Sequence, residues 1–272
     1  MLKTRIITAL IIFAVTLALV FLSSPWLFRL FTALVLLTGC WEFRRLADLS
    51  ATSGWVLQGL QIIILALMIY YWPVVKAEAM IFLVAGCIAW LLMFSRLKVF
   101  REGEKPGNGF RRLGFLSALG ATTFCWFSLS WLHDQPSGPF IVFLLLLIIW
   151  ASDVGAYFSG KQFGRHKLAS VISPKKTWEG VYGGIALAIA AAFLWSELIA
   201  RLNIPASSLL TMAVLTTLAS VGGDLFISIH KRTVGLKDTG TVFPGHGGIL
   251  DRYDSLLAGA PFFALAYGVL AQ

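Results

Sequence analysis

The chain has 272 residues, of which 58% are hydrophobic and 13% charged, and its 22 Lys and Arg against 13 Asp and Glu give a net charge of +9. A mean hydropathy of +0.82 leaves too little polar surface for a soluble globule of this size, so the composition predicts a polytopic membrane protein. In a soluble protein the positive charge would suggest a nucleic-acid partner. Here basic cytoplasmic loops explain the charge, and no nucleic acid is expected.

Taken in chain order, the first apolar run follows a short basic segment. It lacks a small-residue cleavage site and is long enough to span, so it is predicted to be a transmembrane helix and not a signal peptide. Eight more apolar runs follow. Because runs this long must satisfy their backbone hydrogen bonds internally, the predicted fold class is an all-α polytopic membrane protein. The expected spans are residues 6–22, 27–41, 55–75, 77–95, 113–132, 139–158, 181–199, 209–229 and 256–271.

The basic residues predict the orientation of these nine spans. With a cytoplasmic N-terminus, all but three of the 22 Lys and Arg residues fall on the inner side, the exceptions being Arg29, Lys76 and Arg201. The positive-inside rule therefore predicts that the N-terminus is cytoplasmic and the C-terminus external.

The two halves of the chain differ in polar content. Residues 1–132 carry no dense polar motif and are expected to supply scaffold and lipid contact. Residues 133–272 form the expected catalytic half, with cytoplasmic loops at 159–180 and 230–255, and no internal repeat divides this single membrane domain of residues 1–272. Three isolated cysteines in or beside apolar runs, Cys40, Cys87 and Cys125, are predicted to be packing residues.

Two aspartates lie near the inner ends of predicted spans. Asp153 precedes Lys161 by eight residues, which places it on the order of 12 Å below the cytoplasmic charge layer, and Asp224 precedes Lys231 by seven. An intramembrane aspartate costs at least about 2.5 kcal/mol and usually needs a partner or a wet cavity. Either a functional site or a structural ion pair with a loop Lys or Arg is consistent with this pattern.

The loop KQFGRHKLASVISPKKTWEG, residues 161–180, is rich in cations that include Lys175 and Lys176. Such a segment attracts anions, and SPKKTWEG is typical of a turn that leads into a helix. The alternative is ordinary positive-inside charge that contacts anionic headgroups.

The densest polar stretch is SIHKRTVGLKDTGTVFPGHGGILDRYD, residues 228–254. Glycines around His246 would let backbone N–H groups approach a ligand. If the last helix begins near Leu250, Asp251 and Asp254 share one face of its first turn, although either could simply cap the helix. Carboxylates and cations at one membrane face indicate Mg²⁺ and a nucleotide, and hence phosphoryl or nucleotidyl transfer.

This stretch resembles the C-terminal signature of the phosphatidate cytidylyltransferases, or CDP-diacylglycerol synthases. The matching residues are Ser228, Lys231, Arg232, Lys237, Asp238, Gly240, Pro244, His246, Gly247, Gly248, Asp251, Arg252 and Asp254. DVGAYFSGKQFGRHKL, SPKKTWEG and GGDLF are also similar to the family, so motifs cover about the last 120 residues. Ile227, where many members carry Glu, and also His230 and Tyr253 depart from the family pattern.

The resemblance implies the reaction of CTP with phosphatidate to give CDP-diacylglycerol and pyrophosphate, with Mg²⁺ and a monovalent cation such as K⁺. It also implies a homodimer in a bacterial inner membrane. The metal is assigned to Asp224, Asp251 and Asp254, with Asp251 as the expected direct Mg²⁺ ligand. The triphosphate is assigned to Lys231, Arg232 and Lys237, and the orientation of phosphate oxygens to Ser228 and His246. The remaining substrate-binding positions are Asp153, Lys175, Lys176, Ser228, Asp238, His246, Gly247, Gly248 and Arg252.

Three other functions compete with this interpretation. A CTP-dependent lipid kinase of the dolichol-kinase type would attack the γ-phosphorus and release CDP. An ion-coupled transporter would use Asp153 and Asp224 as ion relays near the midplane, but their expected depth is closer to the cytoplasmic face. A bare scaffold that binds anionic lipid needs no aspartate pair.

Overall fold

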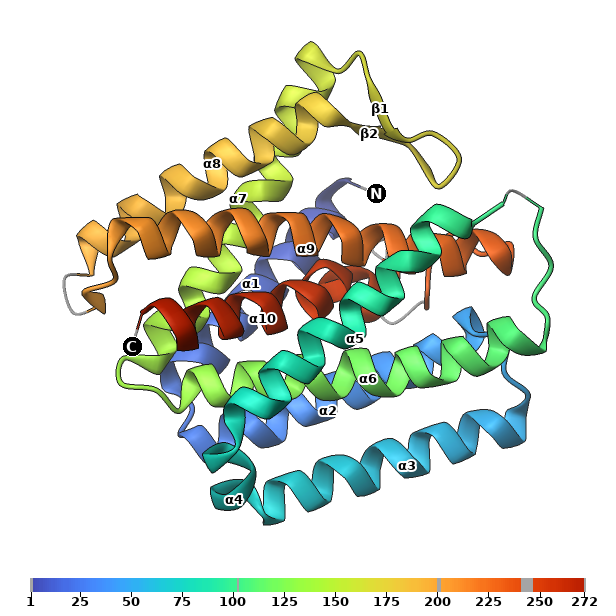
Figure 1. The fold of residues 1–272 in the computed structure, drawn as a ribbon, viewed down its shortest axis with the longest axis horizontal. Helices are drawn as coiled ribbons and strands as arrows, with labels where there is room; N and C mark the ends of the chain where they lie inside the picture. The colour runs from blue at the N-terminus through green and yellow to red at the C-terminus, as the bar shows by residue number, and fades with distance from the viewer. Residues whose placement is uncertain (1, 102, 200–201, 241–246, 272) are drawn as a thin grey trace.

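The computed structural model describes residues 2–101, 103–199, 202–240 and 247–271. This part of the chain folds into helices that run back and forth between the two ends of a bundle, with one small β-hairpin (Figure 1). The elements are α1 (Leu2–Leu22), α2 (Pro25–Leu46), α3 (Ala51–Tyr70), α4 (Trp72–Ala77), α5 (Ala79–Val99), α6 (Asn108–His133), α7 (Gly138–Phe163), β1 (Lys167–Ala169), β2 (Ser173–Thr177), α8 (Trp178–Leu198), α9 (Ala206–Thr233) and α10 (Leu250–Leu270).

Within the described residues, eight helices are long and apolar enough to cross a membrane: α2, α3 and α5 to α10. A shorter apolar stretch, Ile6–Leu22, lies in α1 at the position of the first expected span. The predicted all-α membrane fold is therefore confirmed. The second span was expected to be short, at 27–41, but α2 has 22 residues because Pro25 starts it directly after the N-cap Ser24 and it continues through Arg45.

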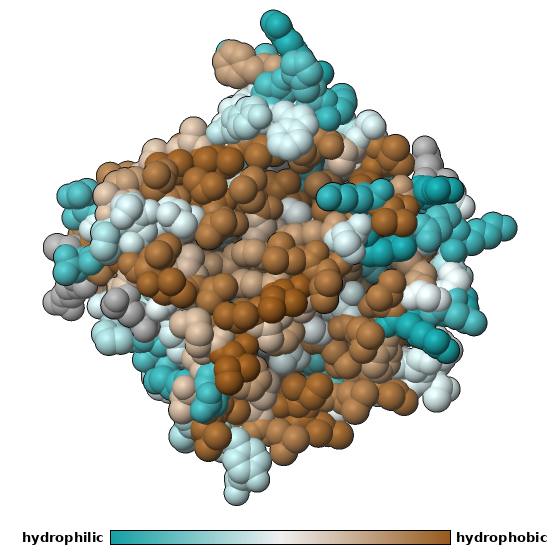
Figure 2. Space-filling view, in the orientation of Figure 1, coloured by the Kyte–Doolittle hydropathy of each residue, from teal (hydrophilic) through white to brown (hydrophobic). Residues whose placement is uncertain are grey.

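The surface shows why such a bundle needs a lipid environment. Apolar residues cover the middle of the face in Figure 2, while polar residues gather at its edges. Large side chains exposed across several helices include Trp55 on α3, Leu92 on α5 and Phe158 on α7. An apolar belt of this kind between polar ends is the surface that a bilayer covers.

Two helix pairs form the frame of the bundle: α7 packs along α8, and α9 along α10. Between α7 and α8 the backbones come unusually close, because a Cβ on Gly155 would lie 2.5 Å from the carbonyl oxygen of Gly183. On the other side of the bundle, α2 packs against α6, which in turn contacts α10. This order brings the first half of the chain against the last helix.

An ionic cluster joins α2, α4 and the turn after α6. The start of α2 and α4 lie at the end of the bundle opposite the C-terminal end of α9 (Figure 1). Asp134 binds Arg29 of α2 at 2.7 Å and Lys76 of α4 at 3.2 Å, and it accepts a hydrogen bond from Trp72 Nε1 at 2.8 Å. Two of the three cations expected on the external side thus lie together. Their common position agrees with the predicted alternation of the spans.

The hairpin β1–β2 is a departure from the all-α expectation. Residues of SPKKT, expected to be part of a turn, pair antiparallel with Lys167–Ala169, so that Lys167 lies opposite Thr177. The predicted helix does follow, since the Thr177 hydroxyl accepts the Gly180 N–H at 3.1 Å as the N-cap of α8. The sequence did not indicate this hairpin, because the hydropathy of such short polar strands does not differ from that of a loop.

Candidate active site

A cavity of about 200 Å³ opens between α7, α8, α9 and the hairpin. Asp153 of α7 and Asp224 of α9 both line it, together with Lys175 and Lys176 of β2. The unpartnered, fully buried hydroxyl of Thr217 also lies on its wall. The structure therefore brings together the two intramembrane aspartates and the two loop lysines that the sequence assigned to one pocket.

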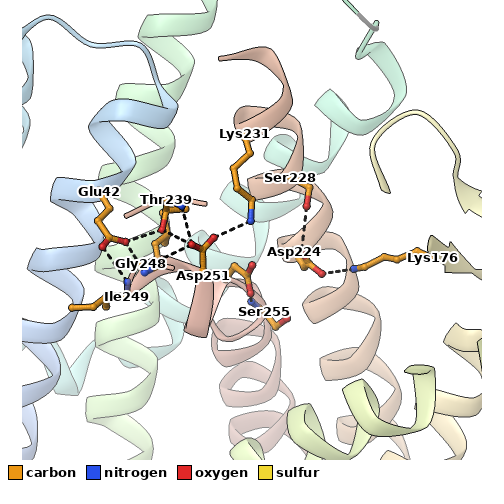
Figure 3. A network of polar contacts seen from close by, with 12 residues as sticks. Glu42, Lys176, Asp224, Ser228, Lys231, Thr239, Gly248, Ile249, Asp251 and Ser255 are labelled. Carbon is orange, nitrogen blue, oxygen red and sulfur yellow. Dashed lines mark hydrogen bonds and ion pairs between the residues drawn. The ribbon is translucent and has the colours of Figure 1, made fainter. Parts of the chain in front are cut away.

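Asp224 carries the ion pair at the centre of this cavity. Its Oδ2 binds Lys176 Nζ at 2.7 Å, and its Oδ1 accepts a hydrogen bond from Ser228 Oγ at 3.2 Å (Figure 3). This contact is the pairing with a loop lysine that the sequence left open as a structural alternative. Both side chains remain partly exposed to the cavity, so the pair is also accessible to a ligand.

Asp251 is held much more tightly than Asp224. Its Oδ2 accepts the backbone N–H of Thr239 at 2.8 Å, the Thr239 hydroxyl at 3.0 Å and the Gly248 N–H at 3.0 Å. Its Oδ1 binds Lys231 Nζ at 3.0 Å, and only 6% of the side chain is exposed. In this arrangement Asp251 holds both described ends of the segment between α9 and α10, residues 234–240 and 247–249, hereafter the α9–α10 loop.

Asp254 lies on the same side of the site as Asp224. Its Oδ1 accepts the Ser255 N–H at 2.8 Å, and its carboxylate lies within electrostatic range of Asp224, Lys231 and Lys176. The first turn of α10 is distorted at Tyr253, which has non-helical φ and ψ. Asp251 and Asp254 thus have different partners, although α10 begins at Leu250 as expected.

The positions of these carboxylates determine which of them could bind a metal ion together. Among the described residues, no group of three or more His, Cys, Asp or Glu side chains is arranged to hold an ion. Asp224 and Asp254 bring two carboxylates to the region that the ammonium groups of Lys176 and Lys231 neutralise. Two hard oxygen donors beside a cavity fit Mg²⁺, which takes few protein ligands and keeps water or phosphate for the rest. Both oxygens of Asp224 and both oxygens of Asp251 already have protein partners, and the metal role of all three aspartates stays a prediction.

The other predicted residues differ in what they contact. Arg232 Nε donates to the Ile172 carbonyl oxygen at 3.4 Å and so joins α9 to the hairpin. Lys237, Asp238 and Arg252 are exposed. Gly247 has φ +82°, a left-handed conformation that suits glycine. His246 and Pro244 lie outside the described residues.

One buried carboxylate was missed by the sequence analysis. Glu42 of α2, only 7% exposed, accepts the Thr239 hydroxyl at 2.8 Å and the Leu250 N–H at 2.9 Å on Oε2, and the Ile249 N–H at 3.0 Å on Oε1 (Figure 3). The predicted span ended at residue 41, which left Glu42 just outside it, whereas α2 continues to Leu46 and buries this carboxylate. A carboxylate inside an apolar helix is a candidate functional residue, so the true length of α2 is the signal that points to Glu42.

The three departures from the family pattern have local explanations. Ile227 is completely buried in the apolar core. His230 packs against Phe226, Phe43 and Phe110, and its Nδ1 lies 3.0 Å from the Phe226 carbonyl oxygen.

Tyr253 also packs against the first half of the chain. Its ring lies against Gly39 of α2, where any Cβ would overlap it, and its hydroxyl donates to the Val35 carbonyl oxygen at 3.3 Å. Glu42, Gly39 and Val35 together make α2 part of the wall behind the α9–α10 loop.

Comparison with known proteins decides the family. The model of the cytidylyltransferase family matches residues 3–270. The chain belongs to this family. It is 36% identical to the phosphatidate cytidylyltransferase of Pseudomonas aeruginosa over 265 residues, 97% of this chain and 96% of that protein. It is 34% identical to the Brucella suis protein of the same name over 285 residues, 100% of this chain and 95% of that one. With the Bacillus subtilis phosphatidate cytidylyltransferase it shares 46% identity over 121 residues, 44% of this chain and 45% of that protein.

Proposed function

We propose that this family member is a phosphatidate cytidylyltransferase, which forms CDP-diacylglycerol and pyrophosphate from CTP and phosphatidate. The observation that carries the proposal is the convergence of Asp224, Lys176 and the Lys231–Asp251 pair at one end of an apolar bundle. Near-complete alignment with relatives of that name supports the same activity.

The reaction needs no protein nucleophile. A phosphate oxygen of the lipid attacks the α-phosphorus of CTP, a new P–O bond forms, and the bond from the α-phosphorus to the bridging oxygen breaks as pyrophosphate leaves. The protein must hold two anions close together and neutralise their charge. Lys175 and Lys176 are suited to the lipid phosphate at the cavity, and Lys231, Arg232 and Lys237 to the triphosphate.

Asp224 and Asp254 would hold Mg²⁺, with Asp251 organising the adjacent loop, and K⁺ is the proposed monovalent cation. A divalent ion in such a site supplies electrostatic stabilisation of the phosphate oxygens. Ser228 orients the Asp224 carboxylate by its hydrogen bond. The assigned role of His246 is to orient a phosphate oxygen, and Asp238, Gly247, Gly248 and Arg252 complete the binding loop in this proposal.

The membrane gives the site its position. Phosphatidate would reach the cavity laterally, and CTP would enter from the cytoplasm, with the N-terminus on the same side. The bacterial relatives support an inner-membrane location, and a homodimer is the assembly that the family resemblance predicts. The apolar belt explains why diacyl chains can approach the site without leaving the bilayer.

The decisive experiment follows the phosphorus atoms. Purified protein in detergent is incubated with phosphatidate, Mg²⁺ and CTP labelled at the α- or the γ-phosphorus. We expect the α-label in the lipid and the γ-label in pyrophosphate. Transfer of the γ-label to lipid would instead establish a lipid kinase, and transfer of neither label would overturn the proposed activity.

A further inference from the structure

Glu42 is an unusual residue for the half of the chain without a sequence signature. It lies one turn before the end of α2, and its neighbours Phe43 and Cys40 are completely buried in the apolar core. Burying a carboxylate is costly unless hydrogen bonds compensate it. Among the described residues, Glu42 accepts hydrogen bonds from three donors, which belong to the α9–α10 loop or the start of α10.

The contacts of Glu42 cap α10 from another helix. Ile249, the residue at the N-cap position of α10, offers no side-chain acceptor. Glu42 instead accepts the N–H groups of Ile249 and Leu250, and the positive end of the helix dipole favours a carboxylate there. The entry of the loop into α10 is therefore fixed by a residue more than 200 positions earlier in the chain.

Glu42 and Asp251 meet at Thr239. The Thr239 hydroxyl lies 2.8 Å from Glu42 Oε2 and 3.0 Å from Asp251 Oδ2, and its single hydrogen serves one carboxylate at a time. Gly240 and Gly248 lie against the Glu42 carboxylate, and an added Cβ on either glycine would overlap its oxygens. Both described ends of the loop are thus fastened to α2.

We propose that Glu42 is a positioning residue for the nucleotide: it holds the α9–α10 loop and the Lys231–Asp251 pair in the geometry that binds the CTP phosphates. The inference rests on the proposed function and adds a residue from the first half to the site. Glu42 itself touches no substrate. Its removal should weaken CTP binding by loosening the loop and should leave the cavity of Asp153 and Lys176 intact.

The test compares Glu42→Gln and Glu42→Asp with Asp134→Asn. Asp134 is a matched control, because it is a carboxylate only 10% exposed with three partners at the opposite end of the bundle. Glutamine would turn an amide N–H₂ towards a donor, so we expect the KM for CTP to rise about tenfold or more. The KM for phosphatidate should change little, and Glu42→Asp should partly restore CTP binding. Asp134→Asn should lower the melting temperature without raising the KM for CTP.

Amide hydrogen exchange gives a second readout in the same samples. The peptide covering residues 247–253 should exchange faster in Glu42→Gln than in the wild type, and at the wild-type rate in Asp134→Asn. The inference would be overturned if Glu42→Gln had the wild-type KM for CTP. It would also be overturned if Glu42→Gln and Asp134→Asn, at equal loss of stability, changed the KM for CTP equally. Where Glu42→Gln fails to fold, Thr239→Val takes its place, with the same rise in KM expected and a wild-type KM counting against the proposal. An inactive wild type would refute the proposed function, while the exchange measurement would still decide whether Glu42 holds the loop.

Discussion

At the scale of single residues, Asp251 and Glu42 perform the same task from opposite sides of one loop. Each is a buried carboxylate whose acceptors are filled by Thr239 and by backbone N–H groups next to α10. Buried carboxylates persist when every lone pair finds a donor. The two carboxylates therefore hold the described ends of the α9–α10 loop, while the Lys237 side chain between them stays exposed.

Asp251→Asn tests this arrangement directly. The amide would turn N–H groups towards the donors of Thr239 or Gly248, and Lys231 would lose its buried partner. Because Asp251 holds Thr239, Gly248 and Lys231 in place, its loss should displace groups of the proposed triphosphate site, and we expect kcat/KM for CTP to fall by about a hundredfold or more. The control is Asp48→Asn. Asp48 also forms an ion pair, with Arg111, but its side chain is 39% exposed. Equal kcat/KM of Asp251→Asn and the wild type would show that Asp251 is not part of the active site.

Gly248→Ala tests the close approach of the loop to α2. A Cβ at this position would overlap the Glu42 carboxylate and the Thr239 hydroxyl. Because these groups are held by other bonds, the loop must move, and we expect weaker CTP binding in an equilibrium assay. Gly109→Ala is the control, since no heavy atom lies within 4 Å of its added Cβ and alanine favours the helix. CTP affinity unchanged by Gly248→Ala would show that the loop is not held in this position.

At the scale of elements, the spacing of α7 and α8 sets the cavity. Gly155 and Gly183 let the two backbones touch, and the cavity beside them is lined by both helices and by Asp224 of α9. Small residues at such crossings determine how closely membrane helices pack. The distance between Asp153 and the lysines of β2 therefore depends on residues that carry no charge.

Gly155→Val should separate α7 from α8. Its first side-chain carbon would already lie 2.5 Å from the Gly183 carbonyl oxygen, so the helices must shift and the lysines of β2 must move with α8. We expect a higher KM for phosphatidate, measured in mixed micelles. Gly59→Val on α3 provides the control, because an added Cβ there meets nothing within 4 Å. A wild-type KM for phosphatidate in Gly155→Val would show that this cavity does not bind the lipid.

The elements also show what sequence can and cannot predict. Long apolar runs located the spans, and fixed spacing located Asp251, Lys231 and Gly248, because both signals are local. Glu42 escaped because its partners are 197 to 208 residues away. The hairpin escaped because strand pairing depends on geometry that hydropathy does not record. Asp153 and Asp224, which the sequence predicts to lie at similar depths on two helices, line one cavity in the structure.

At the scale of the whole molecule, the bundle has two chemically distinct ends. One end has the C-terminal end of α9 and the start of α10, which carry the Lys231–Asp251 pair, and the other has α4 and the start of α2 (Figure 1). The cluster of Arg29, Lys76 and Asp134 belongs to this second end. The positive-inside rule predicts that the site faces the cytoplasm. CTP is present in the cytoplasm, so the proposed activity requires that the cations of the site face the cytoplasm.

Single introduced cysteines can establish this orientation. The three native cysteines are buried and should stay unlabelled by a membrane-impermeant maleimide. Glu78 and Lys105 are exposed, the first between α4 and α5 and the second between α5 and α6. In intact cells we expect labelling of Glu78→Cys alone, and in inside-out vesicles labelling of Lys105→Cys alone. The reverse pattern would place Lys231 and the α9–α10 loop outside the cell, away from CTP, and would contradict the orientation and the proposed function together.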